Sequence, residues 1–307
     1  MSTIIRLPSI SVCIATHKRP QQLAVLLDDL LAQTLRPSQV IVVDNDPTES
    51  ARATVTEKAN AHPELNWIYD TQAVKNISLT RNATMAHATG LWLAFVDDDE
   101  RVRPDWLERL YETAVTHQAD GVLAPVVPIL PAHAPEWLQR GSFYENPRFP
   151  SGTIVPSNVL RIGNALLSSA YAKKHFFDPR YGLTGGEDLD FLLRLRHCGA
   201  VLVWSDEAIA DEGVAEARMR LSWILKRALR GGQDFGRFYL MGRFGYVGFF
   251  QKLLFFFRSL LQTGVAFLLF LVCLPTGKSK SYQWLRKTAA NLGKLSAYAG
   301  LHYKEYS

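Results

Sequence analysis

Hydrophobic positions in the first two-thirds of the chain alternate between short apolar runs and longer stretches with helical spacing. The runs are rich in β-branched residues and short enough for strands, whereas the stretches place apolar residues three and four positions apart. We expect strands at 9–16, 39–45, 66–70, 91–96 and 121–127, and helices at 20–33, 48–60, 78–89 and 104–117. Apolar strands separated by helices are typical of a mostly parallel sheet with helices on both faces.

Three residues indicate where these helices begin. Pro20 and Pro104 fall in first turns, where the missing N–H of proline costs nothing. Ser78 is the expected cap of the helix at 78–89, because a serine hydroxyl can bind a free N–H of the first turn.

Polar clusters follow three of the expected strands. They are Thr16-His17-Lys18-Arg19, Asp44-Asn45-Asp46 and Asp97-Asp98-Asp99. Parallel strands end at the same edge of a sheet, and ligands of such sheets bind beyond that edge. We therefore expect the three clusters to meet in one crevice.

The third cluster is strongly acidic, because Glu100 extends Asp97-Asp98-Asp99 to four adjacent carboxylates. Such a group is strained unless a cation joins it, and hard oxygen ligands favour Mg²⁺ or Mn²⁺. Mg²⁺ commonly combines one or two carboxylates with substrate phosphates, so a nucleoside diphosphate is the expected ligand. The alternative is a solvated acidic turn that favours the start of the next helix.

The sequence lacks the two commonest phosphate cradles. The loop after the first strand, "ATHKRPQQ", contains no glycine, so the dinucleotide-binding fingerprint is absent, and the P-loop pattern is absent too. A nucleotidyltransferase of related sheet architecture, an alternative for the whole protein, would also need a glycine-rich first loop.

A second acidic block lies at 182–199. Gly185-Gly186 permits a tight turn, and the leucines that follow give a helix with Glu187 and Asp188 in its first turn. Acids at a helix start are stabilising by roughly 0.3–1 kcal/mol and need no chemical role. We expect Asp190 to be a solvated residue of this helix.

Four blocks together resemble the family 2 glycosyltransferases of GT-A fold, over residues 9–213. The blocks are "SVCIATHKRPQQLAVLLDDLLAQT", "VIVVDND", "KNISLTRNATMAHATGLWLAFVDDDERVRPDWLE" and "GGEDLDFLLRL". Within this family, the sequence resembles the enzymes of bacterial exopolysaccharide synthesis and is similar to succinoglycan glucosyltransferases. The resemblance implies an α/β, Rossmann-like, mostly parallel sheet flanked by helices.

The resemblance also implies roles for single residues. Asp97 and Asp99 form the metal-binding D-x-D, with Asp99 the direct ligand of Mg²⁺ or Mn²⁺. Asp188 matches the general base, and Glu187 supports it or contacts the acceptor. The residues implied in nucleotide-sugar binding are Thr16, Arg19, Asp44, Asp46, Arg81, Asp97 and Asp98. Asp44 as a cap of the next helix and Arg81 as an exposed helix residue remain the alternatives.

The implied reaction is an inverting hexosyl transfer. Asp188 takes the proton of an acceptor hydroxyl as that oxygen attacks the anomeric carbon of a sugar nucleotide, which is expected to be a UDP-hexose. A single displacement turns an α-linked donor into a β-linkage. The expected acceptor is a glycan or a lipid-linked oligosaccharide.

A proline-rich and aromatic segment at 125–172 separates the acidic blocks. Within it, "NALLSSAYA" (164–172) is expected to form one strand or edge, and Asn164 is a candidate acceptor contact. We expect at least half of its aromatic side chains to fill core.

The last third of the chain differs in charge. Residues 214–307 carry fifteen Lys or Arg and three Asp or Glu, a net charge of +12, which leaves −7 on residues 1–213. We therefore expect a GT-A domain at 1–213 and a membrane-associated helical tail at 214–307. The tail begins with a basic amphipathic helix at 220–237.

The stretch 244–280 is the most apolar of the chain. Arg258 and Gln262 interrupt it, so we expect an interfacial or re-entrant helical hairpin beside anionic lipid of the inner leaflet. A spanning helix would place a basic tail outside, against the positive-inside tendency. A spanning helix and an ordinary buried helical pair are the alternatives.

Composition and motifs indicate the compartment of the protein and argue against nucleic acid as a partner. Three distant cysteines suit a reducing compartment, and "MSTIIRLPSI" is not a secretory signal. We expect a peripheral or monotopic protein on the cytoplasmic face of the inner membrane. No nucleic-acid-binding motif is present, so no nucleic-acid partner is expected. A catalytically idle membrane scaffold is the remaining alternative, and it would not need both Asp99 and Asp188.

Overall fold

A computed structural model describes residues 8–301. The chain forms two compact units: a sheet unit, with the residues up to Val127 and Asn146–Glu212, and a helical unit, with Pro128–Glu145 and the residues from Gly213 on. Residues 128–145 were expected in the N-terminal domain. This segment belongs to the helical unit, because its Leu138 and Phe143 share an apolar cluster with Ile224.

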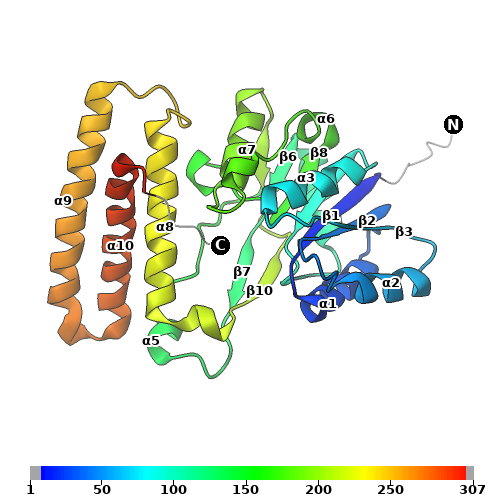
Figure 1. The fold of residues 1–307 in the computed structure, drawn as a ribbon, viewed down its shortest axis with the longest axis horizontal. Helices are drawn as coiled ribbons and strands as arrows, with labels where there is room; N and C mark the ends of the chain where they lie inside the picture. The colour runs from blue at the N-terminus through cyan, green and yellow to red at the C-terminus, as the bar shows by residue number, and fades with distance from the viewer. Residues whose placement is uncertain (1–7, 302–307) are drawn as a thin grey trace. The chain divides into compact units, whose positions relative to one another are not determined.

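The sheet unit is built on a seven-stranded sheet with the order β3-β2-β1-β4-β8-β6-β9 (Figure 1). The strands are β1 (Ile10–Thr16), β2 (Gln39–Asp44), β3 (Asn66–Thr71), β4 (Trp92–Val96), β6 (Gly121–Leu123), β8 (Asn164–Ser168) and β9 (Leu202–Trp204). A three-stranded sheet has the order β5-β10-β7. Its strands are β5 (Glu100–Val102), β7 (Val126–Ile129) and β10 (Ala210–Gly213).

Helices accompany these strands as the apolar spacing predicts. They are α1 (Pro20–Leu31), α2 (Arg52–Ala61), α3 (Ile77–His87), α4 (Trp106–Thr116), α6 (Ser169–Ala172) and α7 (Glu187–His197). Helix α2 begins later than expected, because Asp44 and Asp46 bind backbone N–H groups of the intervening turn. The single strand expected at 121–127 is two strands in different sheets, β6 and β7, which Pro125 separates.

The sheet is mostly parallel, as expected, with one reversed strand. Strands β1 to β4 run parallel, whereas β8 is antiparallel to both β4 and β6. Strand β8 was expected as a strand or edge. It lies inside the sheet, where Ala165, Leu166 and Leu167 are fully buried.

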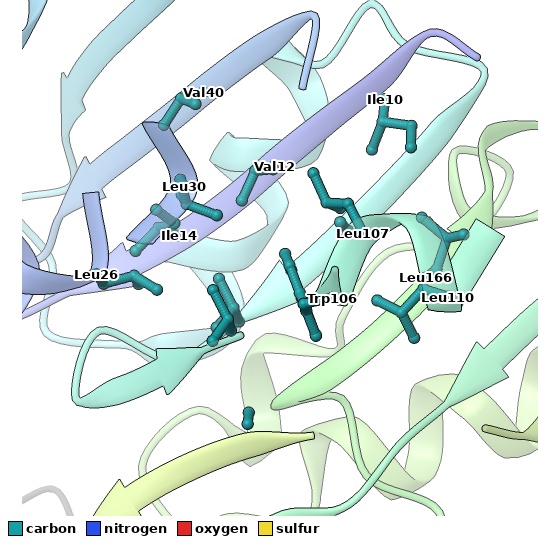
Figure 2. Packing of buried hydrophobic residues seen from close by; sticks show 14 of the residues in the cluster. Ile10, Val12, Ile14, Leu26, Leu30, Val40, Trp106, Leu107, Leu110 and Leu166 are labelled. Carbon is teal, nitrogen blue, oxygen red and sulfur yellow. The ribbon is translucent and has the colours of Figure 1, made fainter. Parts of the chain in front are cut away.

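The core lies on both faces of the sheet. Ile10, Val12 and Ile14 of β1 point to one face and pack against α1 and α4 (Figure 2). The residues that α1 and α4 contribute there are Leu26, Leu30, Trp106, Leu107 and Leu110. On the other face Phe95 meets Phe177. Each such apolar side chain stabilises the fold by about 1.5–3 kcal/mol when it leaves water.

The order of the strands also indicates where on the sheet a ligand is expected to bind. Strands β1, β2 and β3 proceed outward in one direction, and β4 returns to the other side of β1. The order therefore reverses between β1 and β4. Open α/β sheets bind ligands beyond the carboxyl ends of their strands at such a reversal.

The helical unit contains α5 (Glu136–Gln139), α8 (Leu221–Leu240), α9 (Phe249–Cys273) and α10 (Lys278–Ser296). Helix α10 lies between α8 and α9 (Figure 1). Helix α8 confirms the helix expected at 220–237. The hairpin expected within 244–280 is not present in α9, because Arg258 and Gln262 are accommodated in one continuous helix.

Helices α8 and α10 approach closely through glycines. A Cβ atom at Gly232 would lie 1.9 Å from the backbone oxygen of Ala290, and one at Gly293 would lie 2.0 Å from that of Leu229. No side chain larger than hydrogen fits at either position without moving a helix.

Helix α9 is apolar and mostly uncovered. Together with the turn that follows, it forms a 28-residue stretch, Phe249–Thr276, whose most apolar 18-residue window has a mean hydropathy of 1.9 and is 11% buried. By length and composition it is the one helix among residues 8–301 that could cross a membrane.

Candidate functional site

The loop after β1 is tied to the loop after β4. Thr16 donates its hydroxyl to Oδ2 of Asp98 at 2.8 Å. The Nη1 atom of Arg19 lies 2.8 Å from Oδ1 of Asp98 and 2.8 Å from Oδ2 of Asp99. In the second cluster, the N–H of Asn45 donates to the backbone oxygen of Thr16 at 2.8 Å. All three polar clusters thus meet at the reversal point of the sheet, as expected.

Asp98 is the buried member of the acidic turn. Its side chain is only 6% exposed. Burial raises the pKa of Asp98, although Arg19 and the hydroxyl of Thr16 oppose the shift. The residue was expected among the nucleotide contacts. In this structure its carboxylate anchors the first loop, and a nucleotide contact remains a prediction.

Arg81 joins the two acidic blocks. Its Nη1 atom donates to Oε1 of Glu187 at 2.7 Å, and its Nη2 atom donates to Oδ1 of Asp97 at 3.2 Å. The side chain is 11% exposed, so the alternative of an exposed helix residue is wrong. Helix α3 therefore holds the D-x-D turn and the start of α7 through one guanidinium.

The turn before α7 requires glycine. Gly185 and Gly186 have φ angles of 84° and 88°, which side chains rarely adopt. This turn places Glu187 and Asp188 in the first turn of α7, as the sequence predicts. Oδ1 of Asp188 accepts the N–H of Leu189 at 2.7 Å.

Asp190 differs from expectation. It was expected in solvent, but it is 1% exposed. Its Oδ2 atom accepts from Nε of Arg194 at 2.8 Å, one helical turn along α7. A carboxylate is tolerated at this depth because the neighbouring guanidinium neutralises it.

Asp44 and Asp46 shape the turn after β2. The carboxylate of Asp44 is fully buried and accepts the N–H groups of Asp46 at 2.9 Å and Ala51 at 2.8 Å. Asp46 accepts the N–H and hydroxyl groups of Thr48. The bond to Ala51, at the start of α2, matches the capping alternative for Asp44. Nucleotide contacts of both residues remain predictions.

Two asparagines next to the site hold the start of α3. Asn76 accepts the N–H of Leu79 at 3.1 Å and caps α3, so the expectation that Ser78 is the cap is wrong. Ser78 instead donates to the backbone oxygen of Asp178 at 2.9 Å. Oδ1 of Asn45 accepts the backbone N–H of Asn76 at 3.0 Å. The signal was present, because asparagine directly before an apolar helix is a strong cap.

Asn164 is a structural residue. Its Oδ1 atom accepts from the indole of Trp106 at 2.8 Å, and its Nδ2 atom donates to the backbone oxygens of Pro125 and Ala208. The side chain is therefore fully used in the core, and the expected acceptor contact of Asn164 is wrong.

Negative charge dominates this edge of the sheet. Burial, with the charges of Asp97, Asp98 and Glu212, raises the pKa of Asp99 to about 6 although Arg19 opposes the shift. Burial also raises the pKa of Glu100 well above its ordinary value, and the nearby charges of Asp97 and Glu212 add to the effect. Such carboxylates are stabilised by a further positive charge.

The donor set fits a hard divalent ion that uses few protein ligands. Asp97 and Asp99 offer carboxylate oxygens, the donors that Mg²⁺ and Mn²⁺ prefer. Among residues 8–301, no three His, Cys, Asp or Glu side chains are grouped as a self-sufficient metal site. An ion held here would therefore complete its coordination with oxygens of a ligand or water.

Sequence comparison points to one family. The sequence model of Glycosyl transferase family 2 matches residues 11–164. The chain is 38% identical, over 236 residues, to the succinoglycan biosynthesis protein ExoM of Rhizobium meliloti (strain 1021), with 74% of each chain covered.

Solved structures share the fold. The mannosyltransferase PcManGT of Pyrobaculum calidifontis, in complex with GDP-Man and Mn²⁺, is similar with a TM-score of 0.65 and 16% identity over 96% of this chain and 88% of its own. TarS 1–349 of S. aureus, in complex with UDP, has a TM-score of 0.54 and 18% identity over 96% and 93%. These structures confirm the GT-A fold that the resemblance implied.

Proposed function

The chain belongs to glycosyl transferase family 2, and from this premise we propose that it is an inverting transferase of exopolysaccharide synthesis. It moves a hexose from a nucleoside-diphosphate donor, UDP-hexose by preference, to a hydroxyl of a glycan or lipid-linked oligosaccharide. The observation that carries the proposal is the Arg81 bridge, which joins the donor-side acids to the acids at the start of α7. Complexes of similar folds with UDP, UDP-GlcNAc and GDP-Man support a donor of this class.

Asp188 is the proposed general base. It lies in the first turn of α7 beside Glu187, which Arg81 holds. A carboxylate within reach of the acceptor hydroxyl takes its proton as the oxygen attacks the anomeric carbon. Attack from the face opposite the departing diphosphate inverts the anomeric centre, so an α-linked donor gives a β-linkage.

Arg19 and Arg81 are the proposed cationic contacts of the donor diphosphate, with Thr16, Asp44, Asp46 and Asp98 shaping the nucleotide side. Asp99, with Asp97, would hold Mg²⁺ or Mn²⁺. When bound, such an ion stabilises negative charge on the leaving diphosphate. The raised pKa of Asp99 supports a cation at this position, because burial and like charges disfavour a carboxylate without one.

The helical unit is proposed to hold the enzyme on the cytoplasmic face of the inner membrane. Its net charge favours an anionic surface, and α9 offers an uncovered apolar face. We propose that α9 lies in the interface as a monotopic element. An enzyme held there meets lipid-linked acceptors within the plane of the membrane.

The test is the Asp188→Asn variant, assayed with UDP- and GDP-sugars in the presence of Mn²⁺. We expect transfer to fall by about 10²–10⁴-fold, the usual contribution of a general base, while donor affinity measured by calorimetry changes little. EDTA should abolish donor binding in the parent enzyme, and added Mn²⁺ should restore it.

Glu112→Gln is the matched control, because Glu112 is an exposed carboxylate on α4 that pairs with Arg109. This variant should keep full activity. An Asp188→Asn enzyme that retains most of its transfer rate would falsify the assignment of the base. Donor binding that is indifferent to EDTA would remove the metal from the proposal.

A further inference from the structure

The helical unit contains a cavity between α9 and α10. Its volume is about 460 Å³, within the range of small-molecule sites. One wall is apolar and the other carries amide and ammonium groups. The lining residues are Leu261, Gln262, Val265, Ala266, Trp284, Lys287, Ala290, Asn291 and Lys294.

The two lysines of the cavity contact an aromatic ring and an amide. Nζ of Lys287 lies 4.0 Å from the ring centre of Trp284, and Nζ of Lys294 donates to Oδ1 of Asn291 at 2.9 Å. Across the residues that the structure describes, neither lysine pairs with a carboxylate. Burial lowers the pKa of Lys294, and the positive charge of Arg258 adds to the effect. An anion would relieve this arrangement.

We propose that this cavity binds one anionic phospholipid, with its phosphate at Lys287 and Lys294 and an acyl chain along the apolar wall. The proposal rests on the membrane association proposed above and makes it specific. It assigns a discrete lipid site in addition to a general attraction between a basic tail and a charged surface.

The apolar wall identifies the occupant as a lipid rather than a soluble anion. Leu261 and Val265 line the cavity and are 69% and 46% exposed, so the wall continues into the uncovered face of α9. A free phosphate would contact the lysines and leave this wall and Trp284 in water. A bilayer lipid covers both and reaches the cavity from the side on which α9 is bare.

The full-length protein, delipidated in a neutral detergent, tests the proposal by native mass spectrometry and titration. Phosphatidylglycerol should bind with a stoichiometry of one, and phosphatidylcholine should not. Lys287→Gln and Lys294→Gln should each weaken retention about fivefold, since one basic residue near a lipid headgroup contributes about that factor. Lys280→Gln is the control, because Lys280 is an exposed lysine of α10 outside the cavity.

Val265→Trp provides a second variant that keeps every charge and fills the cavity. It should abolish retention of phosphatidylglycerol while α-helical content is preserved. Equal retention in wild type, Lys294→Gln and Val265→Trp would overturn the site. Full competition by inorganic phosphate, or equal binding of phosphatidylcholine, would overturn the assignment to an anionic lipid.

Failure of this proposal is distinguishable from failure of the proposed function. Sugar transfer to a soluble acceptor, measured in the same detergent, reports the transferase alone. If lipid retention is unspecific and transfer is intact, only the lipid site is wrong.

Discussion

The guanidinium of Arg81 pairs with two carboxylates that lie on different parts of the sheet unit. The contact to Glu187 is 106 residues away in the sequence and the contact to Asp97 is 16 residues away. Arginine suits this position because its planar group donates in two directions at once, whereas the ammonium of lysine is a point charge. Arg81 thus positions Asp97 after β4 and Glu187 at the start of α7.

Arg81→Lys should therefore lower transfer while the charge is kept. We expect the turnover rate to fall about ten- to hundredfold, the equivalent of one charged hydrogen bond at about 1.5–3 kcal/mol. The loss should appear in kcat more than in KM for the donor. Arg101→Lys, at an exposed arginine that makes two hydrogen bonds to Asp29, is the control and should leave the turnover rate unchanged. Equal losses in both variants would argue against a positioning role.

Thr16 supports the buried carboxylate of Asp98. Thr16→Val keeps the shape and removes the donor, so Asp98 loses one of its hydrogen bonds in a buried setting. We expect the free energy of unfolding, from urea titration, to fall by about 1–3 kcal/mol. Thr116→Val, at an exposed position of α4, should change it little. An unchanged midpoint for Thr16→Val would mean that Arg19 and the N–H of His17 suffice to hold Asp98.

Sequence reasoning selected candidate residues whose chemistry is conspicuous and misplaced residues whose role is set by packing. The acidic turn and the pair Glu187-Asp188 stood out by charge and position, whereas Arg81 was selected through the family resemblance. Asn164 could not be assigned from the sequence, because its partner Trp106 lies 58 residues away. Asp190 was misplaced because the burial of α7 depends on segments that the helix pattern does not reveal.

At the scale of elements, apolar spacing predicted the strands and helices up to α4 but not every pairing. An apolar pattern predicts that a segment is a buried strand, but it does not give the direction of that strand. The antiparallel position of β8 between β4 and β6 was therefore not predicted. Helix α10 was not expected as a separate element. Its apolar positions are few, and its burial comes from the close glycine contacts with α8.

These glycine contacts allow a paired test within α8. Gly232→Ala should lower the free energy of unfolding of the helical unit by about 1–3 kcal/mol, because its Cβ would meet the backbone of Ala290 at 1.9 Å. The neighbouring Gly231 faces open space. Gly231→Ala should instead raise the free energy by about 0.5–1 kcal/mol through helix propensity. Thermal unfolding followed by circular dichroism measures both, and shifts of the same sign would contradict the close packing.

At the scale of the whole molecule, charge and apolar exposure divide along the chain. The sheet unit carries the acidic turn after β4, and the helical unit carries the basic charge and α9. Net charge and hydropathy are read directly from a sequence, so this division was predictable. The boundary between the units was harder to predict, because residues 128–145 pack in the helical unit against residues that are distant in the sequence.

The proposed monotopic position of α9 predicts that both of its ends lie on one side of the membrane. Single cysteines at Lys252→Cys and Lys278→Cys, in a background without Cys198 and Cys273, should both react with an impermeant maleimide applied from the cytoplasmic side. A separate variant that retains only the exposed Cys198 of the sheet unit and lacks Cys273 is the positive control. Labelling from opposite sides would show that α9 spans the bilayer. A high-salt wash should leave the protein on the membrane in either case.

The double contact of Arg19 has a consequence for turnover. Its guanidinium lies against Asp98 and Asp99. A donor that draws Arg19 toward its phosphates must first break these pairs, and the same pairs re-form as the spent nucleotide departs. The ion pairs therefore weaken the hold on the product, because each phosphate contact of Arg19 is gained at the expense of a contact to Asp98 or Asp99.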